Sequence, residues 1–153
     1  MLYFLGLGSN IGELEKNLEK SIRYISEIGE VSIEKSSSYY KTKPWGDVEQ
    51  DDFLNMMISV KTDHQPDIFL NILQEIEQKM GKKVLRKWGP RIIDIDIVFC
   101  DDLVIESENL KIPHPHSHER DFVLLPMLEI APDFFHPTQK KKIKDLYEQL
   151  RTK

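Results

Sequence analysis

One stretch of the sequence decides the fold: Gly89-Pro90-Arg91-Ile92-Ile93-Asp94-Ile95-Asp96-Ile97-Val98-Phe99. It is rich in β-branched residues and opens on a Gly-Pro turn signal, so it predicts a β-strand. Side chains alternate between the two faces of a strand. We therefore expect Asp94 and Asp96 to share one face, and the opposite face to be apolar, with Ile93, Ile95, Ile97 and Phe99.

Two carboxylates on one face suggest a cation site. On a strand, Asp94 and Asp96 are about 7 Å apart at Cα, and like charges this close repel unless water or a cation separates them. Carboxylate oxygens are hard ligands that suit Mg²⁺ or Ca²⁺. An antiparallel strand with an acidic, solvated face would show the same pattern. The strand alone does not decide between these interpretations.

The basic segment before the strand favours the cation site. Five cations fall within ten residues of an acidic chain: Lys82, Lys83, Arg86, Lys87 and Arg91. Cations beside a carboxylate pair describe a polyphosphate site, because Mg²⁺ bridges phosphate oxygens while Arg and Lys neutralise the remaining charge. A solvated loop is the alternative for such a charge run. No recognised nucleotide loop is present, and the glycines between Gly6 and Gly12 are expected to serve a strand-to-helix turn.

Length and composition describe one domain, residues 1–153. The 153 residues are 40% hydrophobic and 31% charged, as in ordinary globular proteins, and a chain of this length buries roughly 68–70% of its unfolded surface. No run of about 18 apolar residues and no secretory signal occurs, so we expect no membrane span and a cytoplasmic location. The single cysteine, Cys100, fits a reducing compartment and is interpreted as a small core residue. The net charge of −5 disfavours a general nucleic-acid binder, and we expect a monomer.

Periodicity and breakers predict the remaining elements. Besides the strand that carries Asp94, strands are expected over residues 2–7, 31–42 and 53–62. A first helix is expected between the N-cap residue types Ser9 and Asn10 and a stop at Gly29, with these residues facing inward: Leu14, Leu18, Ile22 and Ile25. A second helix is expected from Pro66 to Gly81, with these residues facing inward: Phe69, Leu73, Ile76 and Met80.

The C-terminal part of the sequence adds further elements. The apolar stretch through Ile130 is partly helical in pattern but is expected to be interrupted at Pro126. A tail helix is predicted by one apolar stripe: Ile143, Leu146, Tyr147 and Leu150.

This order of elements, β-α-β-β-α-β followed by C-terminal additions, predicts an α+β fold. It suggests a ferredoxin-like sandwich, in which an antiparallel sheet carries its helices on one face. The other face of the sheet would then be free. In the strand over 53–62, Phe53 and Asn55 alternate away from the core residues, so they are expected on the same free face as Asp94 and Asp96. That face is the candidate site.

Three alternating histidines follow the strand that carries Asp94. His114, His116 and His118 invite a zinc hypothesis, but their spacing is not that of a common zinc site, and no nearby cysteine or glutamate completes one convincingly. Surface histidines, or one histidine that contacts phosphate, are the other interpretations. Arg120 would join the anion site or pair with an acid on the surface.

Several ordered motifs resemble one family, the 6-hydroxymethyl-7,8-dihydropterin pyrophosphokinases of folate biosynthesis. The most specific motif runs from Arg86 to Ile97. The others are Gly8-Ser9-Asn10, Tyr39-Tyr40-Lys41-Thr42-Lys43-Pro44, Phe53-Leu54-Asn55, Ile112-Pro113-His114-Pro115, Glu119-Arg120-Asp121-Phe122-Val123-Leu124 and Glu129-Ile130-Ala131-Pro132. The resemblance covers nearly the whole chain.

The resemblance implies an ATP-dependent enzyme that transfers the pyrophosphoryl group of ATP to the hydroxymethyl oxygen of the pterin and releases AMP. It implies that Asp94 and Asp96 hold two Mg²⁺ ions, and it makes these residues catalytic: Lys82, Arg91, Asp94 and Asp96. It implies these nucleotide contacts: Gln74, Glu77, Arg86, Lys87, Trp88, Arg91, Ile97, Leu110, His114 and Arg120. It implies these pterin contacts: Thr42, Pro44, Trp45, Phe53, Asn55, Trp88, Asp94 and Phe122.

One departure from the family's pattern and two rival classes stand beside this interpretation. The basic loop carries Lys82 and Lys83 where arginines are frequent, and a lysine offers a point charge rather than a fork. An RNA-recognition domain would use the same sheet face, but its Gly-aromatic-Gly-Phe-Val strand is missing and the acidic pair would repel phosphates. A regulatory small-ligand domain with a solvated acidic strand is the second rival.

Overall fold

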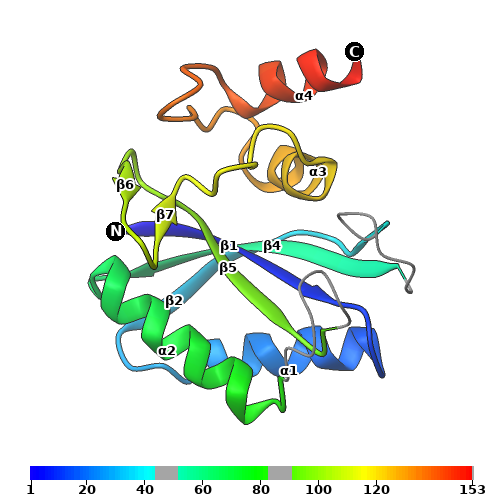
Figure 1. Cartoon of the computed structure of the whole chain (residues 1–153), viewed down its shortest axis with the longest axis vertical. Helices are drawn as coiled ribbons and strands as arrows, with labels where there is room; N and C mark the ends of the chain where they lie inside the picture. Colours follow the sequence, from blue (N-terminus) through cyan, green and yellow to red (C-terminus); the bar gives the residue numbers. More distant parts are fainter. Residues whose placement is uncertain (44–51, 83–90, 153) are drawn as a thin grey trace.

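The computed structural model describes residues 1–43, 52–82 and 91–152, and its centre is an antiparallel sheet (Figure 1). The strand order is β2-β4-β1-β5, with the short strand β3 also paired to β4. The bounds are β1 Leu2–Ser9, β2 Val31–Ser36, β3 Tyr40–Thr42, β4 Phe53–Thr62 and β5 Asp94–Cys100. Two further short strands, β6 (Ile105–Glu106) and β7 (Lys111–Ile112), form a separate pair. The expected α+β class with an antiparallel sheet is confirmed.

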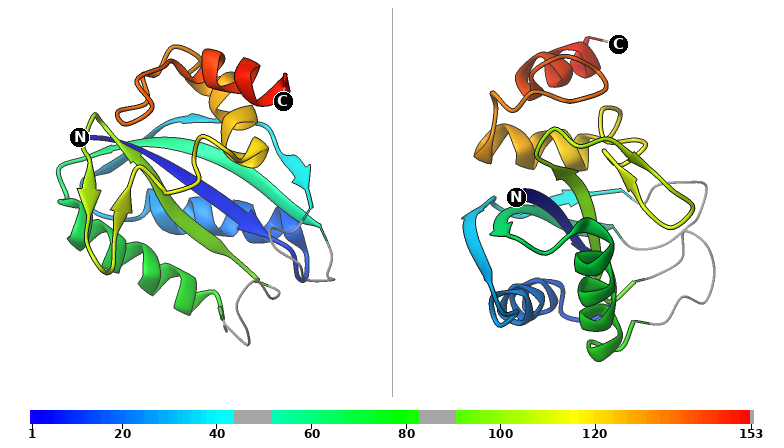
Figure 2. Two further views of the ribbon diagram at one scale, coloured as in Figure 1. Left: turned by 45° about the horizontal axis from the view of Figure 1, so that its top comes forward. Right: turned by 90° about the vertical axis from the view of Figure 1, so that its left-hand side faces the viewer.

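Helices α1 (Leu14–Ser26) and α2 (Pro66–Lys79) cover one face of the sheet (Figure 2). The larger core lies between them and the inward residues of the strands, and it includes Leu5, Ile58, Phe69 and Leu73, all at 0% exposure. The expected second helix is confirmed. Proline occupies its first turn, and Gly81 follows it with a φ of 89°, a left-handed value that glycine adopts readily.

The opposite face of the sheet is only half free, which corrects the expectation of an open face. Helix α3 (Asp121–Ile130) covers the half that carries apolar residues, and α4 (Ile143–Arg151) packs on the outer side of α3 (Figure 1). A second core forms there, and it includes Phe4, Met57, Val98, Phe99, Leu124 and Ile143. Burial of this apolar surface is the physical reason for the cover. The uncovered half carries glycines and polar side chains instead.

A bulge in β5 makes the prediction for Phe99 wrong. The β1–β5 register passes from Leu5↔Ile97 to Phe4↔Phe99, so Val98 is an extra residue with no partner in β1. An extra residue shifts the alternation by one position. Val98 and Phe99 therefore both pack in the second core, whereas Ile93, Ile95 and Ile97 lie in the first core as expected.

Three other local predictions are wrong. The strand expected over 31–42 is broken between β2 and β3, where the Ser37 hydroxyl accepts a hydrogen bond from Met57 N at 2.9 Å. Ser9 and Asn10 do not cap α1, because Ser9 belongs to β1 and Glu13 precedes the helix. Helix α3 continues through Pro126, which is buried.

Membrane crossing would need a long, apolar helix. None of the helices within the described ranges has both properties.

Candidate active site

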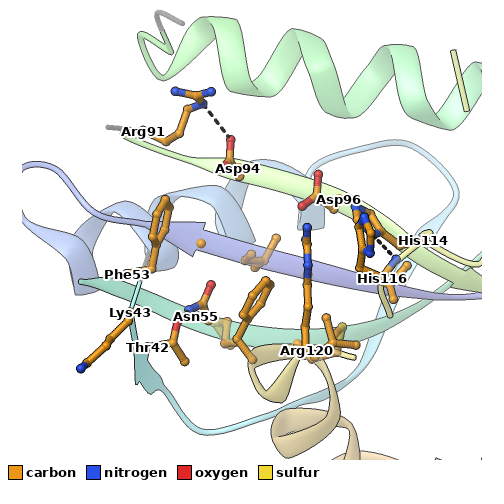
Figure 3. A pocket seen from close by; sticks show the side chains of 18 of the residues that line it. Thr42, Lys43, Phe53, Asn55, Arg91, Asp94, Asp96, His114, His116 and Arg120 are labelled. Atoms are coloured by element: carbon orange, nitrogen blue, oxygen red, sulfur yellow. Dashed lines mark hydrogen bonds and ion pairs between the residues drawn. The ribbon is translucent and has the colours of Figure 1, made fainter. Parts of the chain in front are cut away.

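A cavity of about 420 Å³ lies on the uncovered half of the sheet, against the start of α3. Its floor is formed by β1, β4 and β5, and its walls include the loop that carries His114 and Arg120. Figure 3 shows Asp94 and Asp96 on β5, with Phe53 and Asn55 across the cavity from them. The prediction that these four residues lie on one side of the sheet is confirmed, because all four line the cavity.

Two glycines keep the floor of the cavity open. Gly8 of β1 is the register partner of Asp94, and Gly6 is the partner of Asp96. A Cβ atom at Gly8 would lie 2.8 Å from Oδ1 of Asn55, closer than real contacts allow. Both glycines sit within β1 rather than in the strand-to-helix turn that the sequence suggested. Their lack of side chains gives the aspartates and Asn55 access to the same space.

The Asp94 carboxylate is held by two cations. Lys82 Nζ lies 2.8 Å and Arg91 Nε 3.8 Å from its Oδ1 atom. Burial alone would lower the pKa of Lys82, but the carboxylates of Asp94 and Glu77 outweigh burial and the pKa is raised. Lys82 therefore carries its charge in the site.

Glu77 supports the carboxylate strand from behind. Its Oε2 atom accepts hydrogen bonds from Ile95 N at 2.8 Å and from Lys82 Nζ at 3.0 Å. β5 is an edge strand, so an outward N–H such as that of Ile95 needs a partner beyond the sheet. Burial raises the pKa of Glu77, although Lys82 and the Ile95 N–H oppose the shift. Glu77 thus pins the backbone between the two aspartates.

Asp96 is the perturbed carboxyl of the site. Its side chain is exposed to the cavity, but the walls surround it, and this desolvation together with Asp94 and Glu77 raises its pKa to about 7. Lys82 and Arg120 oppose the shift. A bound cation would favour the charged form of a carboxyl that burial and neighbouring negative charge keep from ionising.

Arg91, His114 and Arg120 surround the carboxylate pair, and their side chains have the chemistry to bind an anion. Arg120 reaches toward Asp96 in Figure 3, and its guanidinium lies 5.2 Å from the centre of the Phe122 ring. Arg91 is fixed by Asn10, whose Oδ1 accepts from Arg91 N at 2.7 Å. Burial, with Arg120 and His116, lowers the pKa of His114 to about 4. His114 is therefore a neutral hydrogen-bonding group near pH 7.

Aromatic side chains and the amide of Asn55 line the other end of the cavity. Nδ2 of Asn55 donates a hydrogen bond to the Thr42 hydroxyl, which fixes the orientation of the amide. The carboxamide oxygen of Asn55 then faces Gly8 and the cavity. Phe53 and Phe122 also line this cavity. A flat heterocycle fits between aromatic faces and a few polar edges of this kind.

Sequence reasoning missed several lining residues. The cavity is also bordered by Gly6, Gly8, Lys43, Met57, Val98 and Val123. The alternation of Gly6 and Gly8 was a usable signal, since both fall on one face of β1. The same alternation along β5 places Val98 on the face of Asp94 and Asp96, so this signal was available for Val98 as well.

Some predicted site residues do not meet in this cavity. Gln74 is exposed on α2, and the other three nucleotide-side residues border the first core or lie within it: Glu77, Ile97 and Leu110. None of the four lines the cavity. Five predicted residues lie outside the described residues: Pro44, Trp45, Arg86, Lys87 and Trp88.

The zinc hypothesis gains no support. His116 and His118 both contact the carboxylate of Glu119, at 3.2 and 3.3 Å. In the described ranges, no group of three or more His, Cys, Asp or Glu side chains is arranged to hold a metal. His114 and His116 both line the cavity (Figure 3), whereas His118 does not.

Comparison with known proteins gives a consistent result. The family described as 7,8-dihydro-6-hydroxymethylpterin-pyrophosphokinase (HPPK) matches residues 4–132. The chain is 42% identical over 142 residues to the 2-amino-4-hydroxy-6-hydroxymethyldihydropteridine pyrophosphokinase of Aquifex aeolicus. The aligned region covers 93% of this chain and 88% of that protein. It is 39% identical to the protein of the same name from Synechocystis, over 95% of this chain and 74% of that one.

A solved structure agrees on the fold. The crystal structure of Plasmodium falciparum HPPK-DHPS with pteroate aligns with 97% of this chain at a TM-score of 0.78 and 18% identity. This chain spans only 42% of that longer protein. At this identity the likeness concerns the fold alone.

Fold and cavity together define an α+β enzyme, with paired carboxylates and cations at one end of its site and aromatic and amide groups at the other. The chain belongs to the 7,8-dihydro-6-hydroxymethylpterin-pyrophosphokinase family. This membership disfavours the RNA-recognition and regulatory-domain interpretations of the sequence.

The raised pKa of Asp96 predicts a stability gain in Asp96→Asn. In the unfolded chain the carboxyl ionises near pH 4, but in the fold only near pH 7, so Asp96 destabilises the fold increasingly between these pH values. Without divalent cations, Asp96→Asn should be more stable than the parent by about 1 kcal/mol at pH 8. This figure allows for screening by water in the cavity, which makes the effect smaller than the pKa shift alone implies. Below pH 4 the two proteins should be nearly equal in stability. Urea unfolding followed by circular dichroism measures this difference.

The matched control for this experiment is Asp102→Asn, in the exposed turn after β5. It should leave stability nearly unchanged at both pH values. Equal effects of the two substitutions at pH 8 would contradict the electrostatic description of Asp96.

Proposed function

We propose that this chain transfers the β,γ-pyrophosphoryl group of ATP to the hydroxymethyl oxygen of 6-hydroxymethyl-7,8-dihydropterin, giving the pterin diphosphate and AMP in folate biosynthesis. Family membership supports the reaction class. One observation carries the assignment to this cavity: the carboxylate pair Asp94 and Asp96 and the amide of Asn55 open onto the same space. A polyphosphate and a flat ring can therefore meet there.

The carboxylate pair fits Mg²⁺. Magnesium is commonly bound by one or two carboxylates, with water and substrate phosphates completing the octahedron, rather than by an all-protein cage. The pair on β5 offers that donor set. Burial and the nearby carboxylates of Asp94 and Glu77 raise the pKa of Asp96, and a bound cation would favour its charged form. When bound, Mg²⁺ would act as a Lewis acid and neutralise the negative charge that develops during transfer. We propose that Asp94 and Asp96 hold two such ions.

The phosphate chain would lie along the cationic wall. Arg91 and Arg120 supply charge, and neutral His114 supplies a hydrogen bond, from positions around the carboxylate pair. Lys82 is within 2.8 Å of Asp94, so it can move from the carboxylate to a phosphate oxygen with a small change of its flexible side chain. Positioning of the two substrates in line and neutralisation of charge are the main catalytic contributions of these residues.

The pterin would lie at the aromatic end. Phe53 and Phe122 offer ring faces, and the Asn55 carboxamide offers a polar edge whose orientation Thr42 fixes. A volume of about 420 Å³ falls within the usual range of small-molecule sites.

The finer predictions about architecture and the remaining contacts belong to the same proposal. Read as β5-β1-β4-β2, the strand order with α1 and α2 on one face supports a ferredoxin-like arrangement within a single domain, residues 1–153. A cytoplasmic location and a monomeric state stay predictions. Roles in nucleotide or pterin binding also stay predictions for Gln74, Glu77, Ile97, Leu110, Pro44, Trp45, Arg86, Lys87 and Trp88.

Product analysis tests the reaction. Protein incubated with ATP, Mg²⁺ and the reduced pterin alcohol should accumulate AMP and pterin diphosphate in equal amounts, measured by anion-exchange chromatography. Omission of the pterin should abolish AMP formation, which controls for hydrolysis. Accumulation of ADP in place of AMP would refute pyrophosphoryl transfer.

The position of Asn55 predicts a selective loss in Asn55→Ala. Removal of the amide deprives the ring edge of its hydrogen bonds, so the KM for the pterin should rise on the order of tenfold or more, while the KM for ATP changes little. Steady-state kinetics with each substrate varied in turn measures both constants. Asn71→Ala, on the exposed side of α2, is the control and should change neither. Equal losses for both substrates would place Asn55 elsewhere in the site.

A further inference from the structure

A buried serine–histidine pair lies beside the cavity, and the proposed reaction does not use it. Ser117 and His136 are 0% and 1% exposed, and the distance from Ser117 Oγ to His136 Nε2 is 2.9 Å. Ser117 lies in the loop between His114 and Arg120. His136 comes after α3, beyond residue 132, where the match to the family ends. Buried polar groups of this kind need a reason.

The hydrogen bonds around His136 assign its proton. Its Nδ1 atom accepts hydrogen bonds from Gln139 N at 3.1 Å and from Thr138 N at 3.3 Å. A ring nitrogen that accepts N–H bonds carries no proton, so the neutral imidazole has its proton on Nε2 and donates it to Ser117 Oγ.

This tautomer excludes a catalytic dyad. A general base must accept the serine proton at the nitrogen that faces the hydroxyl, and here Nε2 is already protonated. Both side chains are also shielded from any substrate. The hydrogen bond between Ser117 and His136 is therefore a structural connection between two segments, not a reactive centre.

The connection holds the loop that carries the anion-binding groups. His114 N donates to Val98 O in the β5 bulge at 3.0 Å, and Ser117 N donates to His114 O at 3.0 Å. These bonds fix the beginning of the loop, and the Ser117 hydroxyl fixes its middle on His136. Beyond Ser117 the chain reaches Arg120, which lines the cavity together with His114.

His136 is itself well anchored. Its backbone N donates to Lys141 O at 2.8 Å, and its carbonyl accepts from Lys140 N at 3.0 Å, so the chain closes a turn around the ring. The Phe99 ring meets the imidazole edge-on at 5.2 Å. The imidazole therefore has a fixed position, and the loop that carries Ser117 is hydrogen-bonded to it.

We propose that His136 is a positioning residue for the phosphate end of the site: it holds Ser117 and thereby sets the places of His114 and Arg120. The identity of the anion as a triphosphate rests on the proposed function, whereas the connection itself does not. The segment after α3 is then part of the functional unit.

The charge state of His136 is consistent with this role. Burial, and then the nearby His118, lower its pKa to about 4. The other side chains that face the ring, those of Ser117, Thr138 and Phe99, do not titrate in this range. The ring therefore stays neutral, and the connection stays intact, near pH 7.

Binding of inorganic triphosphate with Mg²⁺, measured by isothermal titration calorimetry, tests the proposal without catalysis. Ser117→Ala removes the acceptor with little change of volume, and His136→Phe removes the donor but keeps a ring. Each should weaken binding about tenfold. The double variant should bind no more weakly than the weaker single variant, because both changes remove one connection. The affinity for the pterin should change less than about twofold. If the substitutions loosened the whole fold, pterin binding would weaken as well.

The matched control is His118→Ala. This histidine lies in the same loop with its ring 6.0 Å from that of His136, and it should leave triphosphate binding within about twofold of the parent. Circular dichroism confirms that each variant is folded. In the parent protein, ¹⁵N NMR of the imidazoles should show His136 protonated at Nε2 and unprotonated at Nδ1.

Four results would overturn the proposal: the opposite tautomer, parent-like triphosphate binding by folded Ser117→Ala, equal weakening by His118→Ala, or no triphosphate binding by the parent. If the proposed function were wrong but the connection correct, the results would differ from all four of these. In that case AMP would not form, but triphosphate binding would still depend on Ser117 and His136, which would support the connection.

Discussion

The site depends on two like charges that one strand holds on the same face. At a separation of about 7 Å and an effective dielectric constant of about 20, the repulsion between Asp94 and Asp96 is of order 2 kcal/mol. Lys82 and Arg91 pair with Asp94 in a partly buried part of the site. The pKa of Asp96 is nevertheless raised, because burial and the repulsion from Asp94 and Glu77 together outweigh the attraction of Lys82 and Arg120. A divalent cation bound between the two carboxylates would offset this repulsion.

The fold supplies the rigidity that keeps this unfavourable pair together. β5 is paired with β1 on one side, and on its free side the Glu77 carboxylate binds Ile95 N between the aspartates. Two apolar cores hold the sheet from both faces, but the second core ends where the glycines of β1 begin. The boundary between the apolar cover and the glycine-lined floor is where the cavity lies. Packing thus stabilises the sheet and also determines which half of this face stays uncovered and carries the cavity.

The general plan of the fold was predictable from the sequence, because periodicity and breakers specify it. The apolar residues of α2, its Pro66 start and the glycine after it are local signals, and the structure confirms them. The alternation in β4 correctly placed Asn55 beside the aspartates. The covered half of the sheet was missed because tertiary packing of α3 and α4, rather than any local pattern, decides which part of a face is buried.

The sequence predictions that were wrong or incomplete depend on a local bulge or on contacts between segments that are distant in the sequence. The extra residue at Val98 reverses the direction of Phe99, and it frees a carbonyl that accepts from His114 N. The role of Asn10 depends on its contact with Arg91, 81 residues away, so a cap preference could not reveal it. The connection between Ser117 and His136 likewise joins segments that no motif relates. Predicted roles for Pro44, Trp45, Arg86, Lys87 and Trp88 fall outside the described residues.

Direct observation of divalent ions at Asp94 and Asp96 tests the central claim most closely. Electron paramagnetic resonance of Mn²⁺, with a non-hydrolysable ATP analogue bound, reports the number of ions and their affinity without turnover. The account predicts two tightly held ions in the parent protein and loss of at least one in the Asp94→Asn/Asp96→Asn double variant. Unchanged Mn²⁺ binding in that variant, with the fold intact, would contradict it.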